Sequence, residues 1–192
     1  MAPGGIDSIA LLVGVLAVAV AGAATDLVRG KIYNWLTFPA MAAGIVASTW
    51  VHGLSGLGGS VLAIGLGFLL YSWLFVLGAM GAADVKFLMA LGAWGGAHSA
   101  RFVFHTAVLG VVLGGIFAFF SLLFRGRLPA FVRKVWRLVY SASLSVLARE
   151  FEVEAPRIDP SLTLPFGIPI AAAAAWAAIA DPLVRWGGLW PR

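Results

Sequence analysis

Six apolar runs, separated by more polar segments, dominate this sequence of 192 residues. A helix needs about 20 consecutive apolar residues to cross a hydrocarbon core about 30 Å thick. Hydrophobic residues make up 61% of the chain and charged residues 11%, whereas soluble domains carry about 25% charged residues. These features predict an all-α, polytopic membrane protein with about six transmembrane helices, which forms a single domain over residues 1–192.

The predicted spans follow one another along the chain, each with approximate limits. They are Ile6–Thr25, Trp35–Val51, Gly58–Leu77, Val85–Ala97, Phe102–Phe124 and Leu162–Ala180. The fourth span is short for a bilayer, which leaves three interpretations open: extension to about Arg101, a tilted helix, or a partly re-entrant helix. The 24 glycines fit helices that pack closely through small residues.

The lysines and arginines are distributed unevenly about these spans. Two lie between the first and second spans, one at the start of the fourth and seven between the fifth and sixth, all on one side, against three on the other. Because positive charge favours the cytoplasmic side, we expect the N-terminus outside, in a multi-pass protein of the cell inner membrane. The net charge of +5 comes from residues that flank apolar runs, so it indicates a lipid surface as partner and not nucleic acid.

Residues 125–160 form the one long polar segment, which the charge distribution assigns to the cytoplasm. Phe131, Val135 and Leu138 recur at helical spacing, while Arg133 and Lys134 point elsewhere. This pattern favours a basic amphipathic helix on the inner leaflet. A plain connector is the alternative.

Two aspartates lie at the ends of apolar runs, where few polar residues surround them in the sequence. Asp26 follows the first span at its C-terminal end, where the helix dipole disfavours an anion. Asp84 lies at the start of the fourth span. An ionisable residue at membrane depth is by default a functional hypothesis, although Asp84 as a helix N-cap and Asp26 paired with Arg29 or Lys31 are structural alternatives.

The predicted topology brings both aspartates to the same, cytoplasmic side of the membrane. Two close carboxyl groups share a proton, because both cannot easily be ionised at once. One of them can then deprotonate a water while the other donates a hydrogen bond to a carbonyl, as in aspartic proteases. The pair is therefore a candidate catalytic centre, and a proton or cation pathway in a small transporter or channel subunit is the alternative.

Three segments resemble the motifs of the type IV prepilin peptidase family, which are GxGD-type aspartic proteases. Asp26–Thr37 is similar to the family's first aspartate segment, D-x-x-x-x-x-I-P-N-x-L-T, and Gly81–Lys86 is similar to the second, G-x-G-D-x-K. Leu164–Pro169 resembles the proline-glycine motif of the family's last helix. The order and spacing agree over nearly the whole chain. The length is most similar to the short CpaA/TadV-like branch, which lacks the methyltransferase region and serves Flp-type (tight adherence) pili.

The resemblance implies a membrane-embedded aspartic endopeptidase that removes the short basic leader of prepilins at the cytoplasmic membrane face. Asp26 and Asp84 would activate a water jointly, without separate acid and base assignments. The implied partners are the prepilin, through its leader and hydrophobic helix, and the bilayer, with a homo-oligomer left open. The implied chemistry needs no cofactor and no metal, and we expect the three histidines, His52, His98 and His105, on the outer side, away from the aspartates.

Two positions depart from the family pattern. Tyr33 stands where the family usually has proline, and Ala83 stands where it has the second glycine of G-x-G-D. If that glycine is needed for a positive φ, alanine costs about 1 kcal/mol or more. If it only permits close backbone approach, the extra methyl group is tolerable. The departure at Ala83 leaves open an inactive homologue that binds prepilins without cutting them.

The remaining motif residues are expected to support the site. We expect Asn34 to cap the second span, with a hydrogen bond near the site as the alternative. Lys86 is expected to reach the cytoplasmic headgroups or to interact with the aspartate pair. Gly81, Pro165 and Gly167 are expected to shape helix breaks or close contacts.

Overall fold

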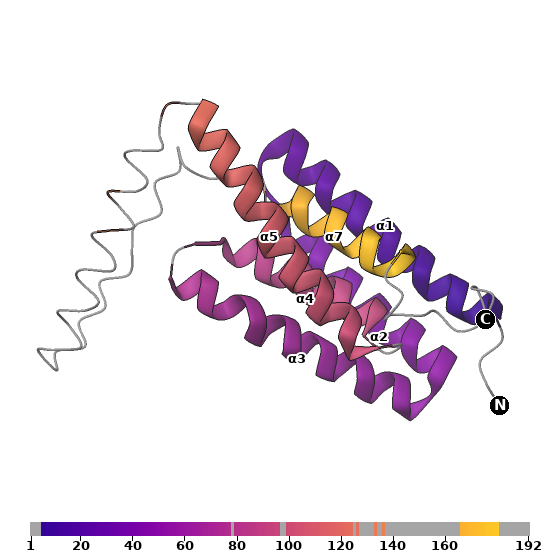
Figure 1. Ribbon diagram of the computed structural model, residues 1–192. Helices are drawn as coiled ribbons and strands as arrows, with labels where there is room; N and C mark the ends of the chain where they lie inside the picture. The colour runs from indigo at the N-terminus through magenta and orange to yellow at the C-terminus, as the bar shows by residue number, and fades with distance from the viewer. Residues whose placement is uncertain are drawn as a thin grey trace, which may run out of the picture.

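The computed structural model describes residues 5–77, 79–96, 99–124 and 166–180, together with the single residues 126, 133 and 136. These residues form six helices and no strand (Figure 1). The helices are α1 (Gly5–Arg29), α2 (Asn34–His52), α3 (Leu54–Val76), α4 (Ala82–Gly95), α5 (Ala100–Phe124) and α7 (Gly167–Ile179). The predicted all-α class is confirmed. Apart from the three single residues, the amphipathic helix predicted in the 125–160 segment lies outside the described residues.

Each helix coincides with one of the six predicted apolar runs, and the largest differences concern the ends. The first helix continues past Thr25 to Arg29 and stops at Gly30, whose φ of 62° is a conformation that favours glycine. The fourth helix begins at Ala82 and ends at Gly95, so the extension to about Arg101 is wrong. With 14 residues it is about 21 Å long.

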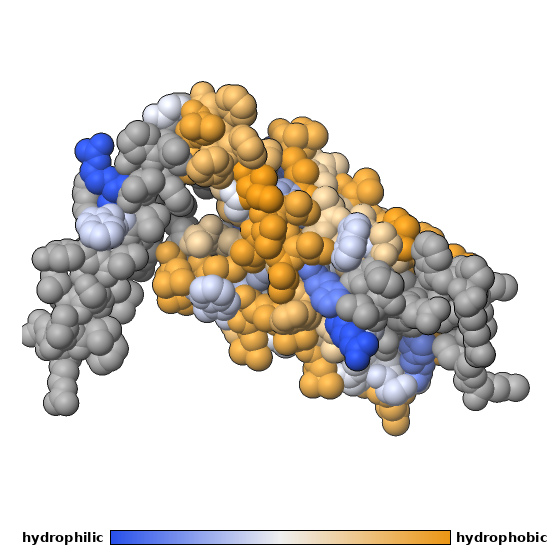
Figure 2. Space-filling view, viewed as in Figure 1, coloured by the Kyte–Doolittle hydropathy of each residue, from blue (hydrophilic) through white to orange (hydrophobic). Residues whose placement is uncertain are grey.

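Three of the described helices are long and apolar enough to cross a membrane, fewer than the six spans expected. They are α1, with its span at Ile9–Arg29, α3 and α5. The other three helices are either too polar or too short to cross a membrane alone. Helix α2 carries several polar side chains, and α4 and α7 have only 14 and 13 residues. The outward surface of the helices is largely hydrophobic (Figure 2), and Trp50 and Leu54 are 88% and 85% exposed. Such a surface is stable in lipid and not in water, in keeping with a multi-pass membrane protein.

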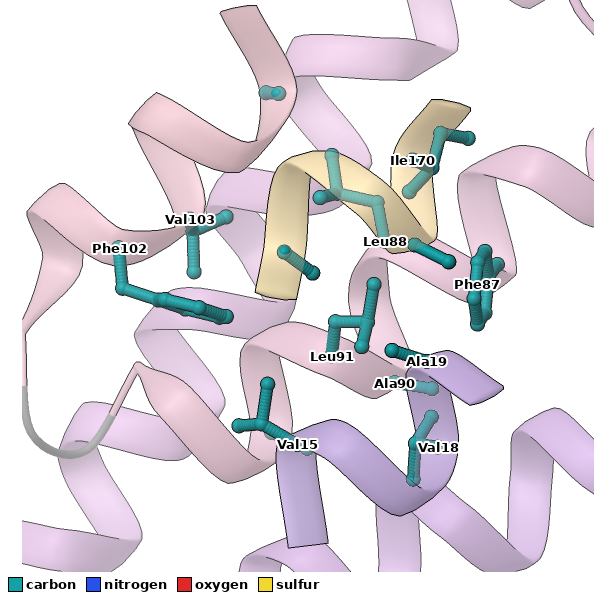
Figure 3. Packing of buried hydrophobic residues seen from close by; sticks show 14 of the residues in the cluster. Val15, Val18, Ala19, Phe87, Leu88, Ala90, Leu91, Phe102, Val103 and Ile170 are labelled. Carbon is teal, nitrogen blue, oxygen red and sulfur yellow. The ribbon is translucent and has the colours of Figure 1, made fainter. Parts of the chain in front are cut away.

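Helix α4 is the centre of the bundle and contacts each of the other five described helices. Figure 3 shows its side chains between those of α1, α5 and α7. Phe87, Leu88 and Leu91 of α4 are completely buried, as are Phe102 of α5 and Ile170 of α7. A helix surrounded on all sides is expected to be apolar all round, which explains the few polar residues after Lys86.

Small residues and buried hydroxyl groups hold α4 close to its neighbours. A Cβ on Gly92 of α4 would lie 3.0 Å from the Ala63 carbonyl oxygen of α3, so a side chain there would require the two helices to move slightly apart. Ser48 of α2 and Ser60 of α3 both donate hydrogen bonds to the Ala93 carbonyl oxygen, at 3.1 and 2.9 Å. Each such bond contributes about 1 kcal/mol, and together they fix α4 against two helices.

The helices alternate in direction because short connections join α1 to α5 in sequence. The C-terminal ends of α1 and α3 therefore share one end of the bundle with the N-terminal ends of α2 and α4. Helix α7 also begins there, since its first amide contacts a side chain of α1. We call this the aspartate end, because it holds Asp26 and Asp84.

Candidate active site

Asp26 projects from the last turn of α1 into the bundle and is 6% exposed. Its Oδ2 accepts a hydrogen bond of 2.7 Å from the Gly167 amide, and the Ile168 amide provides a second backbone interaction. Both amides belong to the first turn of α7, where N–H groups have no partner within the helix. The positive end of the α7 dipole thus offsets the unfavourable position of Asp26 at the negative end of α1.

Asp84 is the third residue of α4 and is 9% exposed. Its Oδ2 accepts a hydrogen bond of 3.1 Å from the Gly81 amide, and its own amide donates to the Gly81 carbonyl at 3.1 Å. Gly81 is at the N-cap position, and the bond from its amide to the Asp84 side chain corresponds to one half of a capping box, while its backbone carbonyl takes the place of a capping side chain. The alternative that Asp84 is itself the N-cap is therefore wrong in position, although its side chain does cap the helix.

The two carboxylates interact electrostatically across the contact between α1 and α4. One turn before Asp26, Gly22 receives the ring of Phe87, which lies three residues after Asp84. Both helices approach closely here because glycine leaves room for the ring. Two neighbouring carboxyl groups in apolar surroundings share a proton more readily than they ionise together, which is the state in which a pair can activate water.

The two neighbouring basic residues form no ion pair with Asp26 among the described residues. Arg29 lies over the Tyr33 ring, 5.8 Å from its centroid, and Lys31 is exposed. Asp26 instead interacts with the start of α7. The structural alternative that Asp26 only pairs with Arg29 or Lys31 is not what the described residues show.

Lys86 and Asn34 join the two motif segments directly. The Lys86 Nζ donates a hydrogen bond of 3.0 Å to the Asn34 Oδ1 and lies 5.4 Å from the centre of the Phe38 ring. Asn34 is the first residue of α2, and the N-cap is Tyr33, which makes no side-chain cap. The prediction that Asn34 caps the helix is wrong, and its side chain instead bonds Lys86, two residues after Asp84.

The two departures from the family pattern fall in unstrained backbone. Ala83 is the second residue of helix α4, so its backbone is right-handed and needs no glycine. Tyr33 has φ of −88° and ψ of 146°, an extended conformation open to any residue. Of the supporting residues, Gly81 and Gly167 contact the aspartates as described, while Pro165 lies outside the described residues.

Tyr71 is a site neighbour that the sequence did not reveal. It is fully buried in α3, donates a hydrogen bond of 3.1 Å to the Ala107 carbonyl and interacts electrostatically with Asp84. Its one sequence signal is a polar aromatic residue inside an apolar run. That signal is weak, because tyrosine is also common at membrane interfaces.

The histidines that the structure describes are far from the aspartates along the bundle. His52 ends α2 and His105 lies in the first turns of α5, both toward the opposite end, while His98 is outside the described residues. Across residues 5–77, 79–96, 99–124 and 166–180, no three His, Asp or Glu side chains are grouped so that they could hold a metal ion.

Comparison with known proteins identifies a family. A model of the type IV leader peptidase family matches residues 11–122, which is more than half of the chain. The matched region contains both aspartates, Lys86 and Asn34, but ends before α7. Comparisons with curated proteins and with solved structures gave no match.

Proposed function

Because this chain belongs to the type IV leader peptidase family, we propose that it is a membrane-embedded aspartic endopeptidase with Asp26 and Asp84 as its catalytic pair. Its substrate would be a prepilin, whose short basic leader it removes at the cytoplasmic face of the inner membrane. The whole chain, residues 1–192, would form one peptidase domain. The motif resemblance further favours a prepilin of the Flp type.

The observation that carries the proposal is the convergence of two buried carboxylates from distant parts of the chain. Asp26 and Asp84 lie at the same end of the bundle and interact electrostatically, and Oδ2 of each accepts a hydrogen bond from a backbone amide. A carboxyl group has about four lone-pair sites, so these backbone amides leave each carboxyl group able to bind a water as well. Preorganised hydrogen bonds of this kind hold a catalytic group in its reactive geometry.

The proposed reaction follows from a pair that shares one proton. The ionised carboxylate takes a proton from a bound water, and the water oxygen attacks the scissile carbonyl carbon. The protonated carboxyl group gives its proton to the carbonyl oxygen, which forms a neutral tetrahedral diol. The first carboxyl group then gives its proton to the leaving nitrogen while the second carboxylate takes a proton from a diol hydroxyl, so that the C–N bond breaks, the leader is released and the pair again holds one proton.

The position of the pair favours a peptidase over a transporter. Asp26 lies in the last turn of α1 and Asp84 in the first turn of α4, whereas relay carboxylates of transporters lie near the bilayer midplane. The uneven distribution of lysine and arginine supports a cytoplasmic location of this end. A cytoplasmic site at the membrane surface is where the junction of a basic leader and a hydrophobic helix would lie.

The test is co-expression with a tagged prepilin, followed by mass measurement of the prepilin N-terminus. Asp26→Asn and Asp84→Asn should each lower the cleavage rate by about 10²–10⁴-fold, as loss of a general acid or base does. Ser72→Ala is the matched control, because this hydroxyl near the same end of α3 bonds only within its own helix. Substantial cleavage by either Asn variant, with membrane levels equal to those of the control, would refute the pair.

A further inference from the structure

The first turn of α7 contacts Asp26, one of the two proposed catalytic residues, although α7 is outside the residues matched by the family model. The Gly167 amide donates the 2.7 Å hydrogen bond to Asp26, and both residues are buried. The Phe166 ring fills the notch at Gly114 of α5, where an added Cβ would lie 2.6 Å from the ring. The first turn of α7 is therefore fixed by α5 as well as by Asp26.

Residue 167 has no room for a side chain. A Cβ built there would lie 2.7 Å from Asp26 Oδ2, 2.9 Å from Asp26 Cβ and 2.9 Å from Ile32 Cδ1. Nonbonded carbon atoms prefer about 3.5–4.0 Å. Any side chain at this position must displace the Asp26 carboxylate or push the start of α7 away from α1.

We infer that Gly167 is a positioning residue for Asp26. Its amide fixes Oδ2, and its missing side chain lets the amide come within hydrogen-bond distance, so that the Asp26 carboxyl group keeps one orientation. The inference rests on the proposed peptidase function. It adds a third segment of the chain to the two aspartate motifs, and that segment contributes backbone, not side-chain chemistry.

The functional test compares Gly167→Ala with Gly115→Ala in purified protein acting on a prepilin substrate. Gly115 lies in α5 with open space around it, so alanine there controls for the substitution itself. Gly167→Ala should lower kcat about 100-fold, the loss expected when a catalytic group is misplaced by about 1 Å, and leave KM unchanged. Gly115→Ala should match the unaltered protein within about twofold. A parallel rise in KM, or unchanged kcat, overturns the positioning role.

A second measurement tests the placement without any activity. The chain contains no cysteine, so an Asp26→Cys, Gly167→Cys variant has a single pair of thiols. The 2.9 Å between Asp26 Cβ and the built Cβ is slightly below the roughly 3.5–4.5 Å of a disulfide, and a small relaxation would allow the bond. Oxidation in native membranes should cross-link this pair, and should not cross-link the Asp26→Cys, Gly115→Cys control pair.

The two measurements separate the possible failures. If no prepilin is cleaved, or if Asp26→Asn still cleaves, the proposed function fails and the catalytic role of Gly167 fails with it, while a cross-link would still support the contact. If Asp26→Asn abolishes cleavage but Gly167→Ala does not reduce kcat, only the positioning role is overturned. Absence of the cross-link in a protein that cleaves prepilin overturns the placement itself.

Discussion

Gly22 of α1 contacts the Phe87 ring of α4 close to both aspartates, so we expect Gly22→Ala to change the separation of the two carboxyl groups although neither aspartate is altered. Gly22 lies one turn before Asp26 in α1, and Phe87 lies three residues after Asp84 in α4. A Cβ on Gly22 would overlap Cε2 and Cζ of the Phe87 ring and lie 3.0 Å from Cδ2. Phe87 is fully buried, so its ring cannot swing away.

The size of the effect follows from this overlap. Carbon atoms in contact prefer about 3.5–4.0 Å, so α1 and α4 must separate by about 1 Å or more. A displacement of about 1 Å costs about 100-fold in rate when reacting groups need close alignment. Overpacking costs about 1–3 kcal/mol of stability, partly offset by the gain of about 1 kcal/mol when alanine replaces glycine within a helix. Activity should therefore fall much more than stability.

The assay is prepilin cleavage by purified protein, with the thermal midpoint measured on the same samples. Gly65→Ala in α3 is the matched control, because Gly65 is exposed and has open space around it. Phe87→Leu in the Gly22→Ala background removes the overlapping ring atoms and should restore part of the lost activity. If Gly22→Ala behaves like Gly65→Ala, or if Phe87→Leu gives no recovery, the reasoning about helix separation is wrong.

Two further predictions concern residues beside the pair. In a double-mutant cycle of unfolding free energy, Lys86→Met and Asn34→Ala should show a coupling of about 0.5–1 kcal/mol, because each substitution removes the same hydrogen bond. Additive effects of the two substitutions would show that this hydrogen bond does not contribute to stability. Ala83→Gly should lower stability by about 0.5–1 kcal/mol and not raise the cleavage rate, because Ala83 already has helical backbone; a gain in cleavage would instead support an inactive parent protein.

The positions of the helices could be predicted because polar residues or glycines lie at both ends of the apolar runs. The prediction of six full spans was less accurate, since hydropathy does not distinguish a lipid-facing helix from one buried by other helices. The α4 helix is apolar because it is surrounded, not because it faces lipid. The polar side chains of α2 are partly used inside the bundle, where Ser48 donates to the Ala93 carbonyl.

The position of Asp26 and Asp84 at the same end of the bundle could be predicted because the order of the apolar runs determines the direction of each helix. The contact of Gly167 with Asp26 could not, since a backbone amide is common to every residue except proline and carries no signal of its own. The same limit applies to Asn34. Its side chain suits a helix cap, and only the fold reveals that Lys86 lies within 3.0 Å.

Helices α4 and α7 are too short to count as membrane spans, and we argue that their shortness allows the two carboxylates to remain buried. A long span brings its terminal amides to the membrane surface, where water can satisfy them. Helix α7 instead begins beside Asp26, about one turn before α1 ends, and α4 begins beside its own Asp84. Each carboxylate therefore has the positive end of a helix as its partner inside the bundle. Lengthening either helix at its start would remove the amide that holds an acid in place, so a reduced length of these two helices is a requirement of the site.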